Sequence, residues 1–141
     1  MEPKMTAAEL TAFLTQVFPL ATKRMIIEAV GDKTARVRWS VNEQDLRPGG
    51  TISGPTMFTL ADTAFYIATM AMIGPEALTV TTSLTINFIS KPPPADLIAE
   101  ARILRLGRVL SVGDVTIFSE GRDDGPVAHC AVTYAVPPAR R

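Results

Sequence analysis

A single carboxylate interrupts the most apolar stretch of the chain. Asp62 lies within Met57–Ile73, where most other residues are apolar or small. Burying an unpaired carboxylate costs on the order of several kcal/mol or raises its pKa, so this side chain needs a partner or a function. We favour a partly desolvated general base or nucleophile in a cleft. The alternative is a structural carboxylate bonded to Thr63, Tyr66, a backbone amide or an arginine across an interface.

The loop before this segment could supply a hydrogen-bond donor to a substrate. Residues 42–56 are rich in turn formers and end on Ser53-Gly54-Pro55 and the start of the apolar segment. The amino end of a helix offers unpaired N–H groups and a partial positive charge, which suit a developing oxyanion. Pro55 has no N–H, so the Gly54 N–H is the candidate donor. The same residues could simply cap and begin the helix.

The only histidine and the only cysteine are neighbours in sequence. Successive side chains of a strand point to opposite faces, so His129 and Cys130 are not expected to form a catalytic pair. We expect His129 to be a partly buried ring bonded to a neighbour, and Cys130 to fill core space. A lone cysteine makes no internal disulfide, and no cysteine or histidine cluster suits a metal. We therefore expect no metal and a reducing, cytoplasmic setting. The chain also has no G-x-G-x-x-G or G-x-x-x-x-G-K-[ST] motif for a nucleotide, so we expect no redox cofactor.

Length, composition and charge exclude several classes of function. The 141 residues, 47% of them hydrophobic and 20% charged, indicate one folded domain over residues 1–141. Fourteen Lys and Arg balance fourteen Asp and Glu, so no positive field attracts a nucleic acid. No secretory signal is visible in the first twenty residues. The stretch 57–73 carries a charge and is shorter than the roughly 20 residues that span a membrane, so we expect a buried helix and no membrane association.

The predicted elements explain how these residues would be positioned. A capping box at Thr6-Ala7-Ala8-Glu9 predicts an amphipathic helix at about 7–17, within residues 6–18, which Pro19 ends. A long, nearly all-apolar helix is predicted at about 55–73. Alternating patterns and turn residues predict strands at 24–30, 33–41, 80–88, 96–106, 109–120 and 127–136. In 80–88 the alternation places Thr81 on the polar face with Ser83. The order indicates an α+β domain, with an antiparallel sheet wrapped around one long central helix.

Three segments together resemble a known family. They read GTISGP at 50–55, LADTA at 60–64 and TTSLTINFISKP at 81–92. They resemble the hotdog-fold acyl-CoA thioesterases of the phenylacetyl-CoA thioesterase (PaaI-like) type, and the resemblance covers about residues 20–136. In that family a G-x-x-H-G-G loop opens the central helix, and an acidic residue nine positions after the histidine activates water or attacks the thioester. Nine positions after Ser53 stands Asp62.

The resemblance implies a role for each matching residue. Asp62 would be the general base or nucleophile, the Gly54 N–H would polarise the thioester carbonyl, and Thr81 would supply an orienting hydroxyl. Gly107-Arg108, at a tight turn between two strands, would meet the pantetheine and phosphates of coenzyme A. The implied reaction hydrolyses an acyl-CoA to free acid and CoA, with coenzyme A present only as part of the substrate.

The chain departs from the family pattern at three positions. Ser53 replaces the usual histidine, Pro55 the second glycine and Arg47 an asparagine that often stands six positions before the histidine. Ser53 and Arg47 could still contact the substrate from these positions. Phe65 and Tyr66 could line an acyl pocket, although aromatic residues at helical spacing also fill cores.

The resemblance also implies an assembly and leaves rival functions open. It implies a homodimer, or paired dimers in a tetramer, in which two sheets join edge to edge and each active site lies between subunits. The missing histidine motivates a non-catalytic acyl-CoA or acyl-carrier binding protein as the alternative. An enoyl-thioester hydratase is less favoured, because such enzymes pair a histidine with an acid and His129 lies in the last strand.

Overall fold

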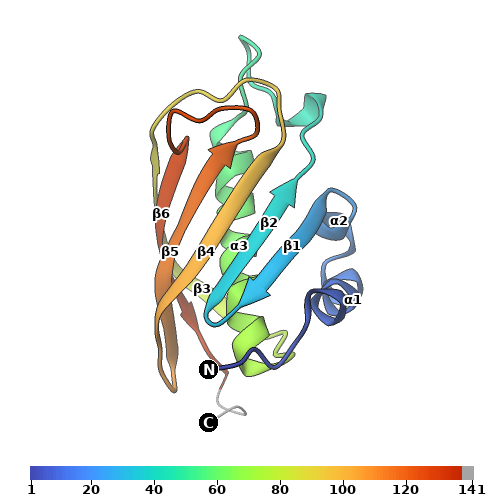
Figure 1. Cartoon of the computed structure of the whole chain (residues 1–141), viewed down its shortest axis with the longest axis vertical. Helices are drawn as coiled ribbons and strands as arrows, with labels where there is room; N and C mark the ends of the chain where they lie inside the picture. Colours follow the sequence, from blue (N-terminus) through green and yellow to red (C-terminus); the bar gives the residue numbers. More distant parts are fainter. Residues whose placement is uncertain (138–141) are drawn as a thin grey trace.

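A six-stranded antiparallel sheet curves around one long helix (Figure 1). The computed structural model describes residues 1–137, so the last four residues of the predicted domain lie outside it. The helices are α1 (Ala7–Val17), α2 (Pro19–Thr22) and α3 (Gly54–Ile73), and the strands are β1 (Met25–Gly31), β2 (Thr34–Trp39), β3 (Val80–Phe88), β4 (Leu97–Leu106), β5 (Leu110–Ser119) and β6 (Ala128–Ala135). The sheet order is β1-β2-β4-β5-β6-β3, which leaves β1 and β3 as edges. This is the predicted α+β hotdog architecture.

Helix α3 is the centre of the core. Ser53 caps its amino end, Pro55 occupies its first turn, and Gly74, with a φ of 94°, ends it. By length and composition alone α3 could span a membrane, but 78% of its most apolar window is buried inside this protein. The sheet and α1 cover it on most sides, which explains why its sequence is apolar nearly all round.

The amino-terminal helices close one side of the molecule next to β1 (Figure 1). The predicted capping box of α1 is present, with the Thr6 hydroxyl accepting from the Glu9 amide at 3.2 Å and the Glu9 carboxylate accepting from the Thr6 amide at 2.9 Å. Phe18 leaves the helical region, with a φ of −139°, and Pro19 then begins the four-residue α2. The sequence reading ended the helical segment at Pro19 and missed α2, because proline is also a good first residue of a new helix.

The two faces of the sheet differ as the alternation in β2 predicts. Val37 and Trp39 are buried against α3, whereas Arg36 and Arg38 point outward. Both arginines pair with Glu28 on β1, at 2.9 and 2.7 Å. One face of the sheet therefore belongs to the core and the other to solvent.

A β-bulge near the start of β3 changes which face Thr81 occupies. Thr81 pairs with Tyr134 of β6, but Ser83 pairs with Thr133, so Thr82 is an extra residue between them. The extra residue puts Thr81 on the helix-facing side, together with Leu84, instead of on the polar side with Ser83. The strict alternation predicted for this strand is therefore wrong at Thr81, and the difference brings Thr81 to Asp62.

Candidate active site

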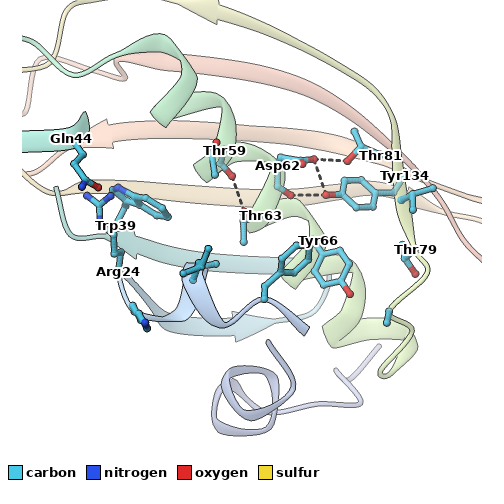
Figure 2. A pocket seen from close by; sticks show the side chains of 16 residues that line it. Arg24, Trp39, Gln44, Thr59, Asp62, Thr63, Tyr66, Thr79, Thr81 and Tyr134 are labelled. Carbon is cyan, nitrogen blue, oxygen red and sulfur yellow. Dashed lines mark hydrogen bonds between the residues drawn. The ribbon is translucent and has the colours of Figure 1, made fainter. Parts of the chain in front are cut away.

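The carboxylate of Asp62 is held by two hydroxyl groups from the sheet (Figure 2). The Thr81 hydroxyl donates to Oδ1 at 2.5 Å, and the Tyr134 hydroxyl lies 2.7 Å from the same oxygen. Tyr134 also lies 2.8 Å from the main-chain carbonyl oxygen of Asp62. Among residues 1–137 the structure records no protein partner for Oδ2 of Asp62. One carboxylate oxygen is thus fixed, and the other is available to a water molecule or a substrate.

Tyr134 is the residue of this cluster that the sequence reading missed. It is buried, and burial together with the charge of Asp62 raises the pKa of its hydroxyl. The hydroxyl therefore stays protonated at neutral pH and acts as a donor. A signal was present in the sequence: Tyr134 falls on the same alternation of β6 as Cys130 and Val132, where a polar group needs a partner.

Asp62 faces a cavity of about 780 Å³ between α3, α2 and the start of β3. At one end of this cavity lie Asp62, Thr81 and Tyr134, and at the other lie Arg24, Trp39 and Gln44 (Figure 2). Apolar side chains line much of the wall between these ends, among them Phe18, Leu20, Ala21 and Val80. The cavity has the size and mixed lining of a small-molecule site.

Of the two aromatic residues proposed for an acyl pocket, only one lines the cavity. Tyr66, four residues after Asp62, lies on the same face of α3 and lines the cavity. Phe65 is fully buried in the core, with its ring centroid 5.6 Å from that of Tyr134, and it does not line the cavity. The expectation for Phe65 is therefore corrected, because one residue along a helix turns a side chain by about 100°.

Gly54 opens into a different cavity from Asp62. This second cavity, of about 350 Å³, is lined by Gly54, the exposed Arg47, Phe88 and Lys91, among others. Gly54 and Asp62 are eight residues apart on one helix, which separates them by about 12 Å along its axis. The structure thus does not bring the two residues of one chain to the same reacting atom.

Ser53 and the turn at Gly107-Arg108 have local structural roles in this chain. The Ser53 hydroxyl accepts from the Thr56 amide at 3.4 Å and donates to the Thr56 hydroxyl at 3.0 Å, so it caps α3 and is not directed at Asp62. The Gly107 amide donates to the Leu110 carbonyl at 2.8 Å within the β4–β5 turn. Neither Ser53 nor Gly107-Arg108 lines either cavity.

A buried carboxylate that the sequence reading overlooked lies behind the Gly54 loop. Asp45, only 3% exposed, forms an ion pair with Arg24 and accepts from the Asn42 amide at 2.9 Å and the Thr56 hydroxyl at 3.0 Å. Burial opposes its ionisation, but the hydrogen bonds, led by that from Arg24, outweigh burial and leave the pKa of Asp45 below its usual value. Asp45 therefore stays charged at neutral pH.

His129 and Cys130 lie on opposite faces of β6, as predicted. His129 is on the outer face, 3.0 Å from the Asp114 carboxylate, and lines neither cavity. Cys130 is fully buried in the core, and burial raises the pKa of its thiol to about 12. Within residues 1–137 no group of three or more His, Cys, Asp and Glu side chains is arranged to hold a metal ion.

Comparisons with known proteins agree with this architecture. A family model described as the thioesterase superfamily matches residues 49–126. A crystal structure of a candidate thioesterase from a Silicibacter species is 45% identical, covers 98% of this chain and 96% of its own, and superposes with a TM-score of 0.90. Comparison with curated protein sequences gives no match.

Two more distant structures share the fold. The PaaI protein of the E. coli phenylacetic acid degradation operon is 22% identical over 93% of both chains, with a TM-score of 0.80. A hypothetical thioesterase of Streptococcus pneumoniae, solved with coenzyme A, is also 22% identical, covers 91% of this chain and 96% of its own, and has a TM-score of 0.77. The chain belongs to the thioesterase superfamily and has the hotdog fold of its PaaI-type members.

Proposed function

We propose that this protein hydrolyses an acyl-CoA thioester to the free acid and CoA, with Asp62 as the catalytic carboxylate. The observation that carries the proposal is the arrangement of Asp62, which lines a cavity of about 780 Å³ and has one carboxylate oxygen held by Thr81 and Tyr134, while the other has no recorded partner among residues 1–137. The pneumococcal relative with coenzyme A supports a CoA ester as substrate.

Two chemical routes are open to a carboxylate held in this way. As a general base, Oδ2 takes a proton from water while the water oxygen attacks the thioester carbon; the C–S bond then breaks and the proton passes to the leaving thiolate. As a nucleophile, Oδ2 attacks the carbon itself, expels the thiolate and forms an anhydride that water hydrolyses. In both routes Thr81 and Tyr134 orient the carboxylate through their bonds to Oδ1, the oxygen that does not react.

A second copy of the chain would complete the site. Thr81, at the amino end of β3, bonds Asp62, whereas Phe88, at the carboxyl end, packs over Gly54, whose Cα would carry a Cβ only 3.1 Å from the ring. Because β3 is an edge strand, two copies can pair it antiparallel about a two-fold axis. The amino end of each β3 then lies beside the carboxyl end of the other, so Asp62 faces Gly54 of the partner subunit. We propose that this Gly54 N–H stabilises the oxyanion.

The direct test of the chemistry is Asp62→Asn. This variant keeps the shape of the side chain and an acceptor for Thr81 and Tyr134 but removes the base. We expect kcat for thiol release from acyl-CoA esters to fall at least about 100-fold. Asp123→Asn, at an exposed turn carboxylate, is the matched control and should leave kcat unchanged. Circular dichroism checks the fold of both variants, and unchanged turnover in Asp62→Asn would overturn the assignment.

Binding without hydrolysis is the alternative function, and one observation favours it. Ser53 occupies the position of the family histidine, and its hydroxyl is committed to capping α3. A binding protein would retain CoA esters in calorimetry while releasing no thiol across aliphatic and aromatic acyl groups. Calorimetry beside the activity panel therefore separates the two functions.

A further inference from the structure

Asp45 bonds the residue before the proposed oxyanion donor, Gly54, and the residue two positions after it. Its main-chain carbonyl accepts from the Ser53 amide at 2.7 Å, immediately before Gly54. Its carboxylate oxygen Oδ1 accepts from the Thr56 hydroxyl at 3.0 Å, two residues after Gly54. The Ser53 hydroxyl donates to Thr56, which closes a chain of hydrogen bonds from Ser53 through Thr56 to Asp45.

Asp45 is itself held on the side away from Gly54. Its other carboxylate oxygen, Oδ2, pairs with the Arg24 guanidinium and accepts from the Asn42 amide at 2.9 Å. Arg24 in turn stacks on Trp39, with its guanidinium carbon 4.8 Å from the ring centroid. The loop that carries Gly54 is thus connected, through the ion pair of the buried Asp45 with the partly exposed Arg24, to the wall of the larger cavity.

This arrangement controls the direction of one N–H bond. The Gly54 N–H belongs to the peptide that joins Ser53 to Gly54, and the hydrogen bonds to Asp45 hold the chain on both sides of that peptide. Displacing a positioned group by about 1 Å can cost roughly 100-fold in rate. Glycine offers no side chain of its own to fix the peptide, so the restraint must come from its neighbours.

We propose that Asp45, acting through Thr56 and Ser53, is a positioning residue that aims the Gly54 N–H at the thioester oxygen. This inference rests on the proposed function and deepens it, because it assigns a role to a carboxylate that lines neither cavity and is not bonded to Asp62. The ion pair with Arg24 keeps the Asp45 carboxylate in place as the acceptor for Thr56.

The test removes the Thr56 hydroxyl without changing the shape of the side chain. In Thr56→Val we expect kcat for thiol release to fall about 10- to 100-fold, since a misaimed oxyanion donor costs transition-state stabilisation. KM should change less than about threefold, because ground-state binding does not use this bond. Thr56→Ser keeps the hydroxyl and should restore most of kcat.

Thr69→Val is the matched control on the same helix. Thr69 is fully buried and bonds Ser111 at 3.1 Å, outside both cavities, so its loss lowers stability but should leave kcat unchanged. Equal kcat in Thr56→Val and wild type, or equal losses in Thr56→Val and Thr69→Val, would overturn the positioning role.

A second variant acts on the carboxylate itself. Asp45→Asn should reproduce the selective loss of kcat, provided that circular dichroism shows a folded protein. If Asp45→Asn does not fold, the result for Thr56→Val decides the question. The Asp62→Asn variant distinguishes failure of the positioning role of Asp45 from failure of the proposed function. Loss of turnover in Asp62→Asn with normal kcat in Thr56→Val refutes the role of Asp45 alone, whereas normal turnover in Asp62→Asn refutes the proposed function and this inference together.

Discussion

Thr81 and Tyr134 both bond Oδ1 of Asp62, so Oδ2 is the oxygen that we propose reacts. A hydrogen bond to a charged acceptor contributes roughly 1.5–3 kcal/mol, so two of them fix the rotamer of the carboxylate. Oδ2 is left to act on water or on the thioester. The proposed base is therefore restrained through one oxygen and has the other without a recorded partner among residues 1–137.

Removing the Tyr134 hydroxyl should weaken catalysis more than folding. In Tyr134→Phe the ring still packs against Phe65 and Tyr66, but Asp62 loses one of its two donors. We expect kcat to fall roughly 10- to 100-fold, with a loss of stability of about 1 kcal/mol. Steady-state kinetics and thermal unfolding measure the two effects. A large loss of stability with unchanged kcat would make Tyr134 a purely structural residue.

The buried thiol of Cys130 should not react with thiol reagents in the native protein. Because burial raises the pKa of Cys130 to about 12, the reactive thiolate is scarce at pH 8. A colourimetric thiol reagent should detect almost no protein thiol until guanidinium unfolds the chain, and then one per chain. Rapid reaction of the native protein would contradict the burial of β6 against α3.

At the residue scale the sequence singled out Asp62 and Thr81, which the structure brings together, but not Tyr134, which also bonds Asp62. Asp62 could be predicted because a carboxylate in an apolar helix is unusual, and the family resemblance pointed to Thr81. Tyr134 and Asp45 could not be predicted in the same way, since each acquires its partner from an element far away in sequence. The sequence predicted that Ser53 stands at the start of the long helix. Which groups its hydroxyl bonds could not be predicted, because this depends on the exact geometry of the helix start.

At the scale of elements, the strand pairing brings the site together. The bulge at Thr82 turns Thr81 toward α3, and pairing with β6 sets Thr81 opposite Tyr134. No glycine in the sequence indicates this bulge. The sequence therefore predicted a regular alternation in β3, which is wrong at Thr81. The long elements were predicted closely, α3 to within one residue, because their hydrophobic patterns and terminal Gly and Pro residues are strong local signals.

The contact between β5 and α3 depends on a glycine. An added Cβ at Gly113 would overlap the Arg102 carbonyl oxygen and lie 2.7 Å from the Phe65 ring. We expect Gly113→Ala to destabilise the fold by about 1–3 kcal/mol in urea or thermal unfolding. Gly107→Ala is the control, because its Cβ would only reach 3.4 Å from the Leu110 carbonyl oxygen. Equal stability of both variants would argue against close packing of Phe65 on β5.

At the scale of the whole molecule, the two halves of the proposed site lie at opposite ends of an edge strand. Asp62 lies near the amino end of β3, and Gly54 near its carboxyl end. A single chain therefore presents the proposed base without the proposed oxyanion donor nearby, and the antiparallel pair of chains that we propose would supply both. Only the family resemblance predicted an assembly. No pattern in the sequence indicates which edge strand of the sheet pairs with a second copy.

Acid should weaken the whole fold partly through Asp45. Its pKa is lowered in the native state, so its contribution to stability is present above the unfolded value of about 3.9 and is lost as pH falls through the native pKa. We expect the wild-type Tm to fall steeply below about pH 4. Asp45→Asn should be less stable at neutral pH, where Arg24 lacks its partner, and should show a flatter acid dependence. Parallel Tm curves for the two proteins would contradict the charged state of Asp45.

Mixing two inactive variants tests the shared site most directly. Asp62→Asn lacks the proposed base, and Gly54→Val places a branched side chain beside the proposed oxyanion donor, against Phe88. Differently tagged copies of the two variants, assembled together and purified as heterodimers, contain one intact site if Asp62 of one chain works with Gly54 of its partner subunit. We predict thiol release at about half the wild-type rate per dimer, with both parent proteins nearly inactive. Heterodimers as inactive as their parents would contradict a site built from two chains.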